Sequence, residues 1–150
     1  MSLDEDMYVK YAPELLRFAA GLVGPSLADD VLSSSFLHAS SSRRWADIDD
    51  RRAYLYRTVL NESRQYLRSD RRRLAREFVA SQREPARSTE ATVELAVALA
   101  DLSPTERAVV FLTYWGGCTA QDTAVTLSLS QRSVERHLRR ARSELRKALR

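Results

Sequence analysis

The apolar residues of this chain recur at steps of three and four positions, the spacing that places side chains on one face of an α-helix. Only four glycines and four prolines occur among 150 residues, and runs of β-branched residues are rare. A hydrophobic fraction of 44% is enough to build a packed core. The sequence therefore predicts an all-α fold of helices joined by short turns. Between residues 6 and 23 the helical pattern is formed by Tyr8, Tyr11, Leu15, Phe18, Ala19 and Leu22.

The first half of the chain is expected to form three helices. The first covers residues 6–23 and ends at the Gly-Pro-Ser sequence 24–26. Ser26 is the predicted N-cap of the second helix, with Asp29 in the capping-box position. The second helix is expected to fray after Ala39 and to be followed by a loop. Its predicted apolar stripe consists of Leu27, Val31, Leu32, Phe36, Leu37 and Ala39.

Three consecutive serines, 33–35, interrupt the stripe of this second helix. Ser33 and Ser34 are predicted to face away from the stripe. Because a serine hydroxyl competes for backbone hydrogen bonds, packing of the apolar stripe must hold the helix together. The third helix is expected over residues 51–73, with arginines in its C-terminal half, where cations suit the helix macrodipole.

A polar segment divides the chain into two expected domains. Residues 77–91 are mixed in charge and contain Pro85, and they are predicted to be a flexible linker. The linker separates a helical domain over residues 1–76 from a second helical domain over residues 92–150.

Capping signals divide the second domain into helices. A helix over residues 94–102 precedes one that has Ser103 as its N-cap, Pro104 at its first position and Glu106 in a capping box. This helix is expected to end at the glycine pair Gly116 and Gly117. Thr119 and Ser130 are the predicted N-caps of the two helices that follow.

The last two helices have the dimensions of a helix-turn-helix, counted over twenty positions from Ala120. Ala124 is small enough for the helices to approach closely, and Ser128 occupies the turn position usually taken by glycine. The predicted apolar seam is Leu127, Val134 and Leu138. The outer side of the second helix carries groups suited to the major groove of DNA, on Gln131, Arg132, Ser133, Glu135, Arg136 and Arg139. The alternative is a plain helical hairpin with a charged exterior.

Two strongly basic segments favour a polyanionic partner. Residues 51–76 hold nine arginines against two acidic residues, and residues 131–150 hold seven arginines and one lysine against two. The first 30 residues are acidic instead. Two separated basic segments indicate two contacts with a polyanion, although each segment alone is equally consistent with a well-solvated helix.

Several kinds of site are disfavoured by the composition. The single cysteine, Cys118, excludes an internal disulfide, and with only His38 and His137 beside it a zinc site is not expected. A buried structural thiol is the expected role of Cys118. The acidic N-terminus lacks an apolar segment, so no signal peptide is expected, and the absence of a run of about 18 apolar residues argues against a membrane span. We expect no cofactor and a cytoplasmic location.

Four segments of the sequence resemble a known protein family. The segment "LSPTERAVVFLTYWGGCTAQDTAVTLSLSQRSVERHLRRARSEL" is similar to the second domain of extracytoplasmic-function sigma factors, the two-domain group of the sigma-70 family. The segments "YAPELLRFAAGLVG", "ADDVLSSSF" and "RRAYLYRTVLNESRQYLRSDRRR" resemble the first domain of these factors in order and spacing. The resemblance covers roughly residues 7–73 and 94–149.

The resemblance implies roles for individual residues. Such factors bind core RNA polymerase and contact the −10 and −35 elements of promoter DNA with their first and second domains. Asn61 matches an asparagine of the −10-reading helix, where Arg57 and Arg64 would meet the non-template strand. The loop 46–50 corresponds to the place where an extruded base is held. The implied −35 contacts are Gln131, Arg132, Ser133, Arg136 and Arg139, whereas Trp45, Tyr54 and Tyr56 are as well explained by core packing.

The helix that would grip polymerase departs from the family pattern. Family members commonly have "A-E-D-L-V-Q-E-T-F" where this chain has "ADDVLSSSF", so Asp29 and Asp30 keep the acids while Ser33 and Ser34 replace a Gln-Glu pair. Loss of a charge-assisted hydrogen bond costs on the order of 1.5–3 kcal/mol, or about ten- to a hundredfold in affinity. Two further positions differ from the family pattern. Leu60 stands where a basic residue is common, and Gln65 stands where an aspartate is common.

The sequence leaves three functions to be distinguished. The first is a sigma factor that gives core RNA polymerase its promoter specificity, performs no catalysis and is controlled by an anti-sigma factor. The second is a sigma-derived helix-turn-helix regulator whose polymerase binding is weakened or depends on a helper, which the serines favour. The third, a small helical enzyme or nuclease, is disfavoured because the chain has no paired histidines, no phosphate-binding glycine loop and no Cys-His pair.

Overall fold

The structure is a computed structural model and describes residues 3–68 and 97–148. Within these two ranges the secondary structure is entirely helical, so the all-α expectation is confirmed. The helices are α1 (Leu3–Val23), α2 (Pro25–Ser41), the 3-10 turn η1 (Trp45–Asp47), α3 (Arg51–Leu67), α6 (Pro104–Tyr114), α7 (Ala120–Leu127) and α8 (Gln131–Ala148). A short helical stretch, 97–101, precedes α6.

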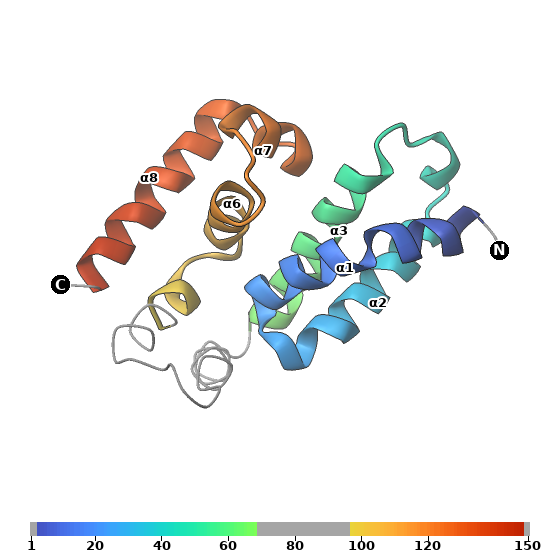
Figure 1. Cartoon of the computed structure of the whole chain (residues 1–150), viewed down its shortest axis with the longest axis horizontal. Coiled ribbons are helices and arrows are strands. Elements are labelled where there is room, and N and C mark those ends of the chain that lie inside the picture. Colours follow the sequence, from blue (N-terminus) through green and yellow to red (C-terminus); the bar gives the residue numbers. More distant parts are fainter. Residues whose placement is uncertain (1–2, 69–96, 149–150) are drawn as a thin grey trace.

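The helices form two groups that share a core. Helices α1, α2 and α3 pack side by side, and α6 lies between them and α8, with α7 at one end of α8 (Figure 1). One buried apolar cluster extends from Leu15 and Phe18 in α1 to Leu112 in α6 and Val134 in α8. The predicted linker, with its boundaries at 76/77 and 91/92, lies outside the described residues.

Helix α2 begins two residues earlier than expected. Its N-cap is Gly24, at φ 86°, and Pro25 occupies the first helical position. Proline suits that position because its φ is already helical and it has no N–H to leave unpaired. The prediction that Ser26 caps this helix was therefore wrong: Ser26 lies exposed within the first turn, and Asp29 with it loses its capping-box role.

The buried face of α2 contains one serine in place of a predicted leucine. The buried residues are Ala28, Val31, Leu32, Ser35, Phe36 and Ala39. Leu37, which we expected in the stripe, is 66% exposed because it lies about 100° around the helix from Phe36. Ser35 instead faces the core, and its hydroxyl donates to the Val31 carbonyl at 2.6 Å.

Local caps define the remaining boundaries. The segment expected to be a loop contains η1, and α3 then begins at Arg51 as predicted, with Asp50 accepting a hydrogen bond from Ala53 N at 3.0 Å. The predicted extension of this helix over residues 69–73 lies outside the described residues. The predicted N-caps of the second group are confirmed by hydrogen bonds at Ser103, Thr119 and Ser130.

Candidate nucleic-acid interface

The predicted helix-turn-helix is formed by α7 and α8. Ala124, Leu127 and Val134 are buried between the helices, and Leu138 packs against the same core, so the predicted seam is confirmed. Ser128 adopts the left-handed conformation, with φ 57° and ψ 44°. Leu129 N donates to the Ala124 carbonyl at 2.9 Å, which closes the turn. The turn holds α8 at a defined angle across α7.

The N-terminal half of α8 presents polar groups to solvent. Gln131, Arg132, Arg136 and Arg139 are exposed, and Ser133 is half-buried. These side chains support one another: Gln131 donates to Glu135 at 3.2 Å, and Arg136 donates to the Ser133 hydroxyl at 3.3 Å. All five predicted −35 contacts therefore lie on the first three turns of one exposed helix, where guanidinium and amide groups can reach base edges and phosphates.

The C-terminal half of α8 is tied to the rest of its domain. Arg142 Nε donates to the Tyr114 hydroxyl at 2.8 Å, and Arg140 Nε lies 3.6 Å from a carboxylate oxygen of Glu106. Between the two halves lies His137, whose pKa is lowered by partial burial and by the positive charge of Arg136. These contacts orient α8 and leave its N-terminal turns free for a ligand.

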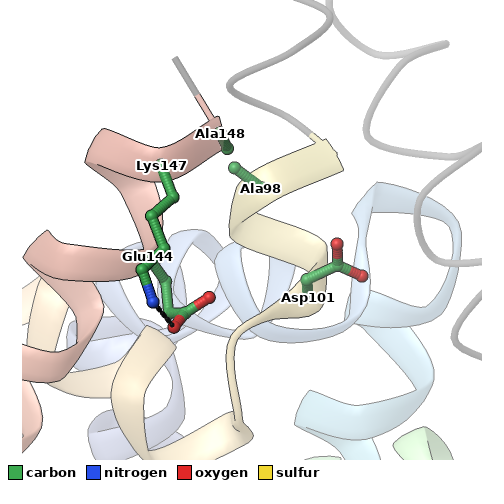
Figure 2. Close-up of a pocket in the computed structure, with 5 residues that line it drawn as sticks. All are labelled: Ala98, Asp101, Glu144, Lys147 and Ala148. Atoms are coloured by element: carbon green, nitrogen blue, oxygen red, sulfur yellow. Dashed lines mark hydrogen bonds and ion pairs between the residues drawn. The ribbon is translucent and has the colours of Figure 1, made fainter. Parts of the chain in front are cut away.

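A small cavity lies at the far end of α8. It has a volume of about 270 Å³ and is lined by Ala98, Asp101, Glu144, Lys147 and Ala148 (Figure 2). Lys147 Nζ is paired with Glu144 at 3.4 Å, and Asp101 adds a second carboxylate. Two carboxylates beside a single ammonium group make this cavity a poor site for a phosphate.

The three predicted −10 contacts lie on one side of α3. Asn61 is exposed, and Arg57 is half-buried with its guanidinium 6.0 Å from the centre of the Tyr54 ring. Arg64 donates to Asn61 Oδ1 at 3.0 Å and to Thr105 Oγ1 at 2.5 Å. The structure thus brings Asn61 and Arg64 together and connects Arg64 to α6.

The aromatic residues beside these contacts belong mainly to the core. Trp45 is 6% exposed and packs edge-on against Phe36, with the Arg51 guanidinium 4.8 Å from its ring centre. Tyr56 is also buried, whereas Tyr54 is half-buried. Core packing therefore explains Trp45 and Tyr56. In the loop 46–50 the residues Ala46, Asp47, Asp49 and Asp50 are exposed.

The four residues of α2 that are predicted to contact polymerase, Asp29, Asp30, Ser33 and Ser34, are not all exposed. Asp29, Asp30 and Ser33 face solvent. Ser34 is half-buried, and its hydroxyl donates to Glu62 Oε2 at 3.1 Å, so the prediction that it faces away from the core was wrong. Glu62 is 7% exposed and is also paired with His38 Nδ1. A buried carboxylate needs such partners because it has lost its water.

A second carboxylate with several partners, the half-buried Glu14, was not identified from the sequence. Glu14 accepts two hydrogen bonds at 2.9 Å from Arg52 and one at 3.0 Å from the Tyr56 hydroxyl. Partial burial raises the pKa of Glu14, but these bonds and the Arg52 charge outweigh it and hold the pKa below its usual value. The same cluster raises the pKa of Arg52, through its bond to Glu14, and that of Tyr56, chiefly through burial. Only the Arg52–Tyr56 spacing of four along one helix hints at this cluster in the sequence.

Neither a metal site nor a membrane span is found in the described parts of the chain. No three histidine, cysteine or carboxylate side chains come together there. None of the described helices is long and apolar enough to cross a membrane. Cys118 is half-buried rather than fully buried, and this burial raises the pKa of its thiol.

Comparisons with known proteins find similar sequences for both helical groups of the chain. The family model "Sigma-70 region 2" matches residues 7–73, and "Sigma-70, region 4" matches residues 92–145. RNA polymerase sigma-E factor from Streptomyces antibioticus is 34% identical, over 90% of this chain and 78% of that protein. The sigma-E factor of Streptomyces coelicolor is 32% identical, over 98% and 86%.

A solved structure shares the fold. The sigma factor RpoE of Bartonella quintana, crystallised in complex with the anti-sigma factor NepR, aligns with a TM-score of 0.69 at 21% sequence identity. The alignment covers 97% of this chain and 95% of that one. The likeness therefore includes both helical groups and not only the helix-turn-helix.

Proposed function

The chain belongs to the sigma-70 family and is an RNA polymerase sigma factor of the extracytoplasmic-function type, and from this premise we propose which of its residues contact promoter and polymerase. Such a factor binds core RNA polymerase, directs it to promoters and starts transcription, without catalysis of its own. The observation that carries the residue assignments is the exposed polar face of α8 on a closed helix-turn-helix.

Helix α8 is the −35-reading element in this proposal. Its N-terminal turns enter the major groove, where Arg132, Arg136 and Arg139 reach guanine edges or phosphates and Gln131 reaches adenine. Ser133 supports Arg136 through the hydrogen bond between their side chains. The anchored arginines further along, at positions 140 and 142, hold the helix in place.

Helix α3 contacts the −10 element of the promoter in this proposal. Asn61 is exposed and supplies an amide that can pair with a base edge, and Arg57 and Arg64 flank it on the same side of the helix. Guanidinium groups at these two positions suit the phosphates of a single strand. The domain limits that accompany this assignment are 1–76 and 92–150, with 77–91 between them.

Polymerase contacts the exposed face of α2 in this proposal. Asp29, Asp30 and Ser33 face solvent there, while Ser34 acts indirectly by bonding to Glu62. That internal bond also favours the second function, a regulator with weakened polymerase binding, because the O–H of Ser34 already donates to Glu62. An anti-sigma factor is a further proposed partner, by analogy with the NepR complex, and the cytoplasm is the proposed site of action.

The experiment that tests these assignments is transcription in vitro from a library of random promoters by core RNA polymerase plus the purified chain. We expect initiation downstream of two shared sequence elements. An Asp29→Asn, Asp30→Asn double variant should be retained less well by core polymerase, with Asp49→Asn as the matched acidic control. If the wild-type chain is not retained by core polymerase unless a helper is added, the second function replaces the first.

A further inference from the structure

The exposed face of α3 continues beyond the three residues proposed to contact the −10 element. Gln65 lies in the last turn of the helix, Arg68 directly follows the helix in a helical conformation, and both side chains are exposed. Gln65 is one helical turn from Asn61, and Arg68 is one turn from Arg64, so these side chains project from the same face. The face that can meet DNA therefore contains two amides rather than one.

The amides and the arginines occupy different edges of this face. At about 100° of rotation per residue, Gln65 lies about 40° to one side of Asn61. Three arginines lie about 20–60° to the other side, namely Arg57, Arg64 and Arg68. A single strand of DNA has its phosphates along one edge and its bases along the other, so the arginine edge suits the backbone and the amide edge suits the bases.

The amide of Asn61 is already engaged within the helix. Arg64 Nη1 donates to Asn61 Oδ1 at 3.0 Å. This bond turns the carbonyl oxygen of the amide toward Arg64 and leaves the amide nitrogen, which only donates, as the group available to a base. Adenine presents an acceptor, N7, beside the donor N6–H2 on its major-groove edge. Asn61 is therefore suited to donating one bond and poorly placed to pair with both atoms of an adenine.

The amide of Gln65 has both of its groups available. Within residues 3–68 and 97–148 its side chain makes no hydrogen bond. A glutamine amide in this state can accept from N6 and donate to N7 of the same adenine. The aspartate that is common at this position in the family only accepts when ionised, so it cannot make the second of these bonds.

We propose that Gln65 is a specificity-determining residue of the −10 contact and pairs with the N6/N7 edge of one adenine of the promoter. The inference rests on the proposed role of α3 in contacting the −10 element. Asn61 donates to a neighbouring base, and the arginine edge holds the backbone. A factor with aspartate at this position lacks the donor, so it should prefer a different base at the same position of the promoter.

The first experiment is transcription in vitro by core RNA polymerase and the purified chain, from promoters in which each base of the −10 element is varied in turn. We expect the wild type to prefer adenine at one position by about five- to hundredfold, the discrimination of one two-bond contact. Gln65→Ala should remove this preference. Gln65→Glu should transfer it to cytosine, whose N4–H2 group donates to a carboxylate. A wild type without an adenine preference at any −10 position overturns the inference.

Gln121→Glu is the matched control, because it makes the same change of charge at an exposed position of α7. It should keep the wild-type base preferences in the −10 element. Both glutamate variants should keep the wild-type circular dichroism, since neither position is buried. An equal loss on every promoter for Gln65→Glu would show that this residue faces phosphates, and unchanged preferences would show that it faces solvent; either result overturns the inference.

The second readout changes a single atom of the DNA. Replacing the preferred adenine by 7-deazaadenine deletes the N7 acceptor and keeps the N6 amino group. Transcription by the wild type should fall about three- to tenfold, the worth of one hydrogen bond. Gln65→Ala should not respond to the replacement, because it has no donor to lose a partner. Equal sensitivity of the two proteins would assign the adenine contact to another residue.

Asn61→Ala separates a failure of this inference from a failure of the proposed function. If Asn61→Ala alters the base preferences of the −10 element and Gln65→Ala does not, α3 reads the promoter without Gln65, and only the inference is lost. If core polymerase retains both variants and neither alters the preferences, the proposed role of α3 is lost as well.

Discussion

The hydroxyl of Ser34 donates a hydrogen bond to Glu62 Oε2 over 3.1 Å, and this bond joins α2 to α3. The other oxygen of the same carboxylate is paired with His38. One buried carboxylate is thus satisfied by two side chains from the neighbouring helix. The serine at position 34 therefore has a structural role, in addition to changing the surface available to polymerase.

Replacing Ser34 by glutamate should destabilise the protein. The new carboxylate would lie against buried Glu62, so a hydrogen bond would be exchanged for repulsion between like charges in a poorly solvated site. We expect a loss of about 1–3 kcal/mol, seen as a fall of several degrees in the thermal midpoint by circular dichroism. Ser33→Glu, at the neighbouring exposed position, is the control. Equal midpoints for the two variants would contradict the role of the Ser34–Glu62 bond.

The hydrogen bonds of Glu14 make the stability of the folded protein depend on pH. Because the folded state holds its pKa below the usual value, its contribution is fully present above the unfolded pKa of about 4.3 and is lost as pH falls toward the folded pKa. Glu14→Gln should therefore lower the thermal midpoint at pH 7 and differ less from wild type as the pH is reduced below 4. A difference that stays constant from pH 7 to pH 3 would show that Glu14 acts by packing alone.

Arg136→Ala should reduce promoter specificity at one position of the −35 element. A contact to a base edge is worth about 1–3 kcal/mol of discrimination. In transcription assays with core polymerase, we expect a five- to hundredfold loss on the preferred sequence, and a smaller loss on a sequence changed at the contacted base pair. Arg146→Ala, at the exposed C-terminal end of α8, should weaken both sequences alike. Uniform loss for Arg136→Ala would assign this residue to phosphate contact instead.

Ser128→Gly should stabilise the helix-turn-helix. Ser128 has φ 57°, a conformation that costs a residue with a Cβ atom about 1 kcal/mol relative to glycine. The glycine variant should unfold at a thermal midpoint higher by a few degrees, whereas Ser128→Ala should bring no such gain. If both variants unfold at the wild-type midpoint, the serine side chain is offsetting the strain of the turn.

Local features were predictable because they depend on residues three or four positions apart. The caps at Ser103, Thr119 and Ser130, the buried seam around Ala124 and Val134, and the left-handed turn at Ser128 all follow from such spacing. The errors in α2 were also local. Gly24 and Pro25 form a better start than the serine after them, and Leu37 lies one step off the buried face.

The sequence by itself determined the helices, their order and the polar face of α8, because helical periodicity and capping are encoded in neighbouring residues. Only the tertiary structure decided which polar side chains meet: Ser34 with Glu62, Glu14 with Arg52, Arg64 with Thr105 and Arg107 with Leu22. These partners lie 28 to 85 positions apart. Buried polar groups must be paired wherever packing brings them together, and no short-range spacing records where that will be.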